Sequence, residues 1–235
     1  GIKYVMNPYD EYAVEEALQI KEKFGGTVTI VCLGPDRATE AIRTALAMGA
    51  DEAVHINHPA FEGSDSFATA KILAKVIGDM KCDLILTGKQ AVDMDESQVF
   101  GHLAELLDIP YVSVVVDLEI SPDGKTATAR RETEGGVEEV VEATLPAVIA
   151  AQKGLNEPRY ASLPNIMKAK RKEIKKIDLA ASGLDAGQVG EKGSKSRSEN
   201  YRLPPERQAG KKLEGEPAET AAELTKLLRE EAKLI

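Results

Sequence analysis

Apolar residues recur at helical spacing near the start of the chain. Four of them fall three or four residues apart between Ala13 and Phe24, just before a glycine pair at 25–26. A stripe with this spacing is typical of an amphipathic helix, and a glycine pair is typical of a helix end. Asp10 stands where a capping side chain is expected. The pattern therefore predicts a helix over 10–24.

Short apolar runs alternate with further amphipathic stretches as far as residue 116. The runs are typical of buried strands and the stretches of helices. Such alternation implies a mostly parallel sheet covered by helices on both faces, which is the α/β class. We therefore expect a Rossmann-like, doubly wound sheet. The expected strands are 27–33, 53–57, 83–87 and 111–116, and the expected helices between them are 36–49, 66–77 and 96–107.

The pattern changes after residue 116. Two short strand patterns flank the turn at 121–125, which predicts a β-hairpin. Another strand pattern follows the glycine pair at 135–136. We expect an antiparallel annex at about 117–143, followed by a last buried strand over 146–151.

From residue 156 onward the composition shifts towards Pro, Lys, Gly and Ser. Such a segment buries little apolar surface and predicts an extended arm rather than a second domain. We expect an α/β domain over 1–155, a loop with a basic helix over 156–176, and a C-terminal arm over 177–235. The arm ends in a helix whose apolar stripe needs a partner surface. That stripe consists of Ala221, Leu224, Leu227 and Leu228.

The chain opens almost directly into its first helix. In a doubly wound sheet the first strand is normally central, and the turn after it borders the ligand crevice. We therefore expect a strand to be missing before Gly1.

Composition narrows the class of protein. The net charge of −9 argues against a general binder of nucleic acid or anionic membranes, because those need basic surfaces to meet phosphate. The chain has no run of about 20 apolar residues and no signal-peptide pattern at its start. Two cysteines, Cys32 and Cys82, fit packed thiols in a reducing compartment. We expect a soluble, cytoplasmic protein.

The strand at 83–87 leads through a polar, glycine-containing loop into the helix expected at 96–107. A helix start offers unpaired N–H groups and partial positive charge, so a phosphate group can bind there. A capped turn that binds nothing fits the spacing equally well. No Walker A motif and no Gly-x-Gly-x-x-Gly occurs in the sequence.

We expect no catalytic or metal site. His55 and His58 lack an evident third ligand, which favours an ordinary surface pair. No Gly-x-Ser-x-Gly elbow is present, and no cysteine has a plausible activating histidine nearby.

The segment 156–172 combines prolines, a few apolar residues and a run of cations. This combination suits docking on a protein with an apolar socket and an acidic rim. A helix that packs its apolar residues and solvates its lysines explains the same composition.

The segments 83–98 and 156–172, together with 6–10 and 42–51, resemble the β subunit of electron-transfer flavoproteins. The similarity runs from about residue 3 to the C-terminus, and 155–160 and 163–170 are its most specific parts. The resemblance implies a Rossmann-like fold of the adenine nucleotide alpha hydrolase type. It implies an α subunit that carries FAD, with the C-terminal arm of this chain embracing it. It also implies AMP in the β subunit, or a second FAD in electron-bifurcating members.

The resemblance also implies two sets of site residues. Glu157 and Arg159 would lie where the partner recognition loop, within 156–176, joins the body of the protein. The implied nucleotide site is formed by Asn7, Leu33 through its backbone, Ala91, Asp93, Ser97, Gln98 and Val99. The implied partner-binding residues are Leu163 as the apolar anchor, with Pro164, Ile166, Met167, Lys168 and Arg171.

The function implied by the resemblance is that of an electron carrier, not of an enzyme. Such a heterodimer accepts electrons from acyl-CoA dehydrogenases of fatty acid β-oxidation and passes them to a quinone reductase. The compartment would be the cytoplasm in bacteria or the mitochondrial matrix in eukaryotes. AMP is favoured over a second FAD because the loop lacks the Gly-Asp-Thr pattern associated with bifurcating members. Two alternatives stay open: a bifurcating subunit whose own FAD oxidises NADH, and a nucleotide-binding domain of the universal-stress type.

Overall fold

The structure is a computed structural model that describes residues 3–206 and 209–235. These residues form two compact units, one reaching to Arg197 and one running from Ser198 to Ile235. The strands are β1 Thr29–Leu33, β2 Glu52–Ile56, β3 Ile85–Gly88, β4 Tyr111–Ile120, β5 Thr126–Glu132, β6 Glu138–Thr144, β7 Val148–Ala151 and β8 Lys175–Ile177. The α-helices are α1 Pro8–Phe24, α2 Thr39–Met48, α3 Ser66–Gly78, α4 Val99–Leu107, α5 Leu163–Arg171, α6 Leu179–Ser182, α7 Gly190–Gly193 and α8 Pro217–Glu230. Short 3₁₀ helices are η1 Asp36–Ala38, η2 Pro59–Phe61, η3 Glu134–Gly136 and η4 Ala186–Gln188.

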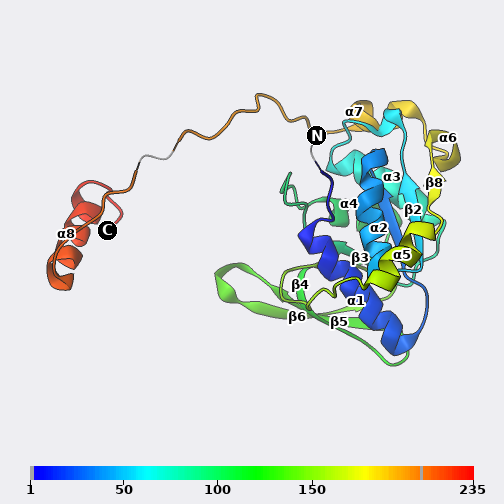
Figure 1. The fold of residues 1–235 in the computed structure, drawn as a ribbon, viewed down its shortest axis with the longest axis horizontal. Helices are drawn as coiled ribbons and strands as arrows, with labels where there is room; N and C mark the ends of the chain where they lie inside the picture. The colour runs from blue at the N-terminus through cyan, green and yellow to red at the C-terminus, as the bar shows by residue number, and fades with distance from the viewer. Residues whose placement is uncertain (1–2, 207–208) are drawn as a thin grey trace. The chain divides into compact units, whose positions relative to one another are not determined.

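The described strands of the first unit form two hydrogen-bonded sheets (Figure 1). The smaller sheet has the order β1-β2-β8, and both of its strand pairs are parallel. The larger has the order β3-β7-β4-β5-β6, in which the first two pairs are parallel and the last two antiparallel. β1 and β3 are edge strands of these sheets. The α/β fold with a mostly parallel arrangement and an antiparallel annex is therefore confirmed.

α1 begins earlier than predicted, at Pro8, with Asn7 at the capping position. Proline favours the first helical turn because its φ is already helical. Asp10 therefore lies inside the first turn, and its carboxylate accepts a hydrogen bond from the Gly88 N–H at 2.8 Å. The predicted cap at Asp10 was wrong, whereas the predicted stop at Gly25 is confirmed.

α4 begins later than predicted, at Val99 instead of residue 96. Asp95 and Ser97 have φ angles of 51° and 53°, which a right-handed helix does not contain. Residues 96–98 therefore belong to the loop between β3 and α4.

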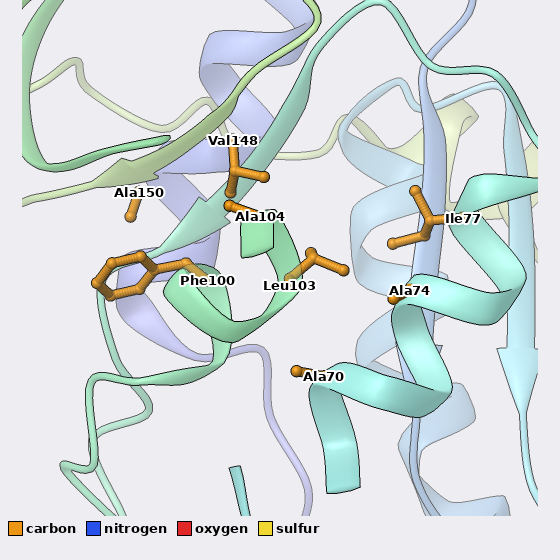
Figure 2. Close-up of a cluster of buried hydrophobic side chains, with 8 residues drawn as sticks. All are labelled: Ala70, Ala74, Ile77, Phe100, Leu103, Ala104, Val148 and Ala150. Atoms are coloured by element: carbon orange, nitrogen blue, oxygen red, sulfur yellow. The ribbon is translucent and has the colours of Figure 1, made fainter. Parts of the chain in front are cut away.

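One apolar cluster joins the two sheets. Figure 2 shows Leu103 and Ala104 of α4 lying between side chains of α3 and Val148 of β7. Val31 of β1 and Ile85 of β3 pack against the same cluster, so both sheets share this part of the core. The buried members are Ala70, Ala74, Ile77, Phe100, Leu103, Ala104, Val148 and Ala150.

Helices cover both faces of β1. Ile30 packs against a cluster formed by α1 and α2, whereas the next residue, Val31, packs against α3 and α4. Successive strand residues point to opposite faces of a sheet. The two pairs of helices therefore lie on opposite faces of β1, which is the doubly wound arrangement.

β4 links the parallel strands to the antiparallel annex. Its first residues pair with β7, and residues from Val115 onward pair with β5. A bulge separates Ser113 from Val115, and Val114 inside it has a φ of 61°. One continuous strand thus replaces the two that we expected over 111–120.

Residues 175–197 pack within the first unit, although composition had suggested an extended arm. β8 pairs in parallel with β2, and Val189 is buried in an apolar cluster with β2 and α3 residues. The boundaries predicted at residues 155 and 176 fall inside this unit. The pairing partner of β8 lies far away in the sequence, which is why local composition did not predict it.

Asp65 fastens the end of the first unit. One carboxylate oxygen caps α3 by accepting from the Ala68 N–H, and the other accepts from the N–H groups of Lys195 and Ser196. Although burial alone raises the pKa of Asp65, these backbone hydrogen bonds lower it to about 2.

α8 is the helix of the second unit, and its existence was predicted correctly. No described residue of α8 is buried, and Leu224 on its apolar stripe is 49% exposed. Across both units, none of the helices that the structure describes is long and apolar enough to cross a membrane.

Candidate functional site

The loop at 89–98, between β3 and α4, is fastened to the start of α1 by Asn7. The Asn7 side-chain amide donates to the Gln90 carbonyl at 2.8 Å, and its oxygen accepts from the Val92 N–H at 3.2 Å. One side chain thus uses both of its polar groups to hold the loop. Asn7 therefore lies beside the backbone around Ala91.

Hydrogen bonds within the loop fix its shape. The Ser97 hydroxyl donates to the Lys89 carbonyl at 3.0 Å, and the Asp95 N–H donates to the Ala91 carbonyl at 2.9 Å. The Glu96 carboxylate accepts from the Ser66 hydroxyl at the start of α3. The loop, which leads directly into α4, is therefore also hydrogen-bonded to the start of α3.

Gln98 and Val99 lie at the N-terminus of α4. Gln98 occupies the capping position, and its side chain makes no capping hydrogen bond. The first backbone N–H groups of an α-helix have no partner within the helix and carry partial positive charge. The N-terminus of α4 is thus able to receive an anionic group, with Ser97 next to it.

Asp93 is exposed in the same loop, which follows β3, whereas Leu33 lies on β1. Leu33 ends β1 and packs against the apolar cluster that contains Val189. The residues that the structure gathers at the 89–98 loop are Asn7, Ala91, Asp93, Ser97, Gln98 and Val99.

Asp10 carries a half-buried carboxyl beside this loop that the sequence did not single out as a site residue. Burial raises its pKa above the usual 3.8, although hydrogen bonds from the Gly88 N–H and the Asn7 side chain oppose the rise. Burial and the nearby Asp10 also raise the pKa of the Cys32 thiol, to about 11. Cys32 is therefore a poor nucleophile, in agreement with its interpretation as a packed thiol.

The residues predicted for partner binding lie on α5. Ser162 caps this helix by accepting from the Asn165 N–H, and Pro164 stands in its first turn. Leu163 is 79% exposed and Met167 is 55% exposed. The complete set, all exposed, is Leu163, Pro164, Ile166, Met167, Lys168 and Arg171.

The chain before α5 is anchored on α1 by Arg159. Its guanidinium donates to Glu15 at 2.8 and 2.9 Å and to Glu22 at 2.5 and 3.2 Å, and its backbone N–H donates to Glu15 as well. Burial by itself raises the pKa of Glu15, but hydrogen bonds from Arg159 outweigh it and hold that pKa below its usual range. Arg159 thus joins the segment to the body, as the resemblance implied, whereas Glu157 is exposed.

The end of α5 is held by α2. Arg43 donates to the Ala169 carbonyl at 2.5 Å and also to the Lys172 carbonyl. Lys172 in turn donates to the Ala50 carbonyl at 2.5 Å, and Ala169 is 2% exposed. Both ends of the segment 159–172 are therefore fixed to the first unit.

The two histidines do not form a surface pair. His55 is fully buried on β2 and contacts the Gly34 carbonyl through Nε2 at 2.9 Å, while His58 caps η2 by accepting from the Ala60 N–H. The prediction for His55 was wrong because β2 lies between β1 and β8. Within residues 3–206 and 209–235, no group of three or more His, Cys, Asp or Glu side chains is arranged to hold a metal.

Comparison with known proteins identifies the family. Residues 1–182 match the family model described as "Electron transfer flavoprotein domain". The electron transfer flavoprotein subunit beta of Bacillus subtilis (strain 168) is 48% identical over 100% of this chain and 90% of its own length. The subunit of the same name from Sus scrofa is 42% identical over 98% of this chain and 86% of its own length.

A third relative carries a different name. Protein FixA from Azotobacter vinelandii is 42% identical over 83% of this chain and 71% of its own length. The names of the other two describe electron carriers rather than enzymes, in agreement with our prediction. The chain therefore belongs to the electron transfer flavoprotein family, as a subunit of the β type.

Proposed function

We propose that the chain forms a heterodimer with a flavin-carrying α subunit and docks acyl-CoA dehydrogenases or related flavin dehydrogenases through α5. The heterodimer then passes electrons to a quinone reductase. FAD, bound mainly by the α subunit, supplies the electron-carrying chemistry when present. The observation that carries this proposal is the exposed apolar surface of α5 beside its cations.

Leu163 has the properties of an anchor for a protein partner. A large side chain that is 79% exposed gains most from entering an apolar socket, because nearly all of its surface is removed from water there. Lys168 and Arg171 stand on the same helix and supply positive charge. Cations beside an apolar anchor suit a socket with an acidic rim and speed the encounter with it.

The test is electron acceptance by the heterodimer carrying Leu163→Ala. We expect the KM for a reduced acyl-CoA dehydrogenase to rise at least about tenfold, as expected for loss of an interface hot spot. FAD content and heterodimer assembly should stay unchanged. Val140→Ala is the matched control, because Val140 is 72% exposed on β6. An unchanged KM for Leu163→Ala would remove the basis of the proposal.

We propose AMP as the nucleotide of this subunit. The fit rests on the N-terminus of α4, whose backbone N–H groups have no side-chain cap and suit a phosphate. Ser97 and Gln98 would add donors beside it, and the exposed Asp93 would accept from a ribose hydroxyl. Asn7 would keep the loop in place, and the backbone of Leu33 would approach from β1.

Nucleotide content tests this part of the proposal. Acid release from the purified heterodimer should give one FAD and one AMP. Asn7→Ala should lower the AMP content, because it removes both hydrogen bonds that fasten the loop to α1. Two flavins and no AMP would instead support a bifurcating subunit that oxidises NADH.

A further inference from the structure

α5 rests on the first unit with little apolar support. Among its described residues only Ala169 is buried, while Leu163, Ile166 and Met167 are exposed. Ala169 packs in a small cluster with Ile42 and Leu46 of α2, and Ala161 and Ile174, on either side of α5, pack against the same cluster. One methyl group buries too little surface to fix the direction of a helix by itself.

Polar contacts between α2 and α5 supply what the apolar contact lacks. Arg43, on α2, donates from Nη1 to the carbonyls of Ala169 and Lys172 at the end of α5. Lys172, just past α5, donates from Nζ to the Ala50 carbonyl just past α2. Arg43 thus meets a carbonyl in the last turn of α5, and Lys172 meets a carbonyl two residues beyond the end of α2. We call these two residues the reciprocal clamp.

The chemistry of a helix end explains why cations occupy these positions. The last carbonyls of an α-helix have no partner within it and carry partial negative charge. A hydrogen bond from a charged donor to such a carbonyl is stronger than one between neutral groups. Asp51, which follows Ala50, lies close enough to Lys172 to interact with it electrostatically and is paired with Lys21 at 2.6 Å. The Asp51 carboxylate is therefore shared between Lys21 and Lys172.

The clamp lies at one end of α5 and the proposed anchor at the other. With a rise of about 1.5 Å per residue, Leu163 stands roughly 9 Å along the helix from Ala169. Arg159 anchors the chain just before α5 on α1, so the direction of α5 is set between that anchor and the clamp, and loss of the clamp frees the C-terminal end of the helix. Figure 1 shows α5 lying alongside α2, the helix that carries Arg43.

We propose that Arg43 and Lys172 are positioning residues that fix the direction of α5 on α2 and so present Leu163 and Met167 to the electron-donating partner. This inference rests on the proposed docking function. Neither residue needs to touch the partner. Their effect on electron transfer is transmitted through the helix they hold.

The experiment compares Arg43→Ala and Lys172→Ala with wild type in the complete heterodimer. For a reduced acyl-CoA dehydrogenase we expect the KM to rise roughly tenfold for Arg43→Ala, whose lost hydrogen bonds are charge-assisted, with kcat within about twofold. Lys172→Ala, which loses one hydrogen bond, should give a smaller rise. Arg43→Lys should recover part of the loss, because it keeps a charged donor. Tryptic cleavage at Lys168, Lys170 and Arg171 should become faster in Arg43→Ala.

Thr44→Ala is the matched control, since Thr44 is exposed on α2 and its hydroxyl donates to the Glu40 carbonyl within that helix. FAD content and thermal unfolding show whether each variant is folded. If Leu163→Ala raises the KM and a folded Arg43→Ala does not, the inference is overturned while the docking function stands. If Leu163→Ala leaves the KM unchanged, the docking function fails first. A raised KM with unchanged tryptic cleavage in Arg43→Ala would also overturn the positioning inference, because α5 would then be held without Arg43.

Discussion

Gly88 lies at the end of β3, where the first turn of α1 approaches most closely. A Cβ atom there would stand 2.7 Å from both the Tyr9 Cβ and an Asp10 carboxylate oxygen, and 2.9 Å from the Tyr9 carbonyl carbon. Two of these three atoms cannot move without shifting the helix backbone. The glycine is therefore required by close packing, since its φ is not among the positive values.

Gly88→Ala is expected to lower the free energy of unfolding by about 2 kcal/mol, the usual cost of overpacking a tight contact. Urea unfolding of the heterodimer followed by circular dichroism measures the change. Gly210→Ala serves as the control, because a Cβ at Gly210 meets nothing within 4 Å. Equal stability of the two variants would show that α1 moves away from β3 without cost.

Asp10 gives a prediction for pH. Its folded-state pKa is raised above the usual 3.8 by burial, so folding favours the protonated carboxyl. The stability it contributes is complete below about pH 3.8 and is lost as pH rises through the raised pKa. Asp10→Asn resembles the protonated form at every pH. Relative to wild type, this variant should gain unfolding free energy between about pH 4 and pH 7.

The measurement is the difference in unfolding free energy between Asp10→Asn and wild type across that range. Taking a difference cancels the contributions to the unfolding free energy from carboxyls that titrate equally in both proteins, such as Asp65. A difference that does not change with pH would mean that folding does not raise the pKa of Asp10. The Asn side chain keeps an oxygen that can accept from the Gly88 N–H, so the contact itself is preserved.

At the scale of elements, Asp65 connects α3 to the last residues of the first unit. Asp65→Ala removes a helix cap and three contacts to Lys195 and Ser196. Loss of a cap costs about 1 kcal/mol, and the freed segment should become accessible to proteases. Limited proteolysis at Lys195 and Arg197, compared with wild type, tests this. Unchanged cleavage would show that Val189 and β8 hold the segment without Asp65.

Helices and strands with a clear periodic pattern were predictable, whereas their ends were not. The core strands and α1 to α4 stand out because each buries an apolar face with its own period. The start of α4 was misplaced because Asp95 and Ser97 adopt positive φ angles, which no residue type there announces. β8 was missed because its place depends on β2, not on its own three residues.

The candidate site was predictable only in part. The loop at 89–98 follows from its strand-loop-helix pattern, and α5 from its mixture of apolar residues and cations. The sequence predicted Asp10 only as a helix cap. Its burial arises from the approach of β3 to α1, a tertiary contact that the local pattern does not reveal. Arg43 was missed for the same reason: the carbonyls it meets lie far along the chain.

At the scale of the molecule, the core belongs to the first unit. Among the residues that the structure describes, the members of the five buried apolar clusters and the residues packed against them all lie between Met6 and Val189. α8, in the second unit, has an apolar stripe that includes Leu224 and Leu228, and no described residue of this helix is buried. An isolated helix of this length is marginal in water, so α8 needs a surface to cover its stripe.

We expect the α subunit to provide that surface. Ending the chain after Arg197 should leave the thermal unfolding of the first unit nearly unchanged, because no residue of its apolar clusters is removed. The same truncation should weaken heterodimer formation, measured by the Kd for the α subunit. Leu224→Ser together with Leu228→Ser should weaken it by at least about tenfold, since both substitutions remove apolar surface from the stripe.

Thr225→Ser on the same helix is the matched control, because it keeps a hydroxyl able to donate to the Ala221 carbonyl. Should the truncated chain bind the α subunit as tightly as the full chain, the arm would have no role in the heterodimer. Should the truncated chain instead unfold at a lower temperature without any partner, the second unit would stabilise the first directly. Only weaker association with unchanged unfolding supports an arm that serves the partner, because apolar surface left uncovered in the free chain is stabilised on binding.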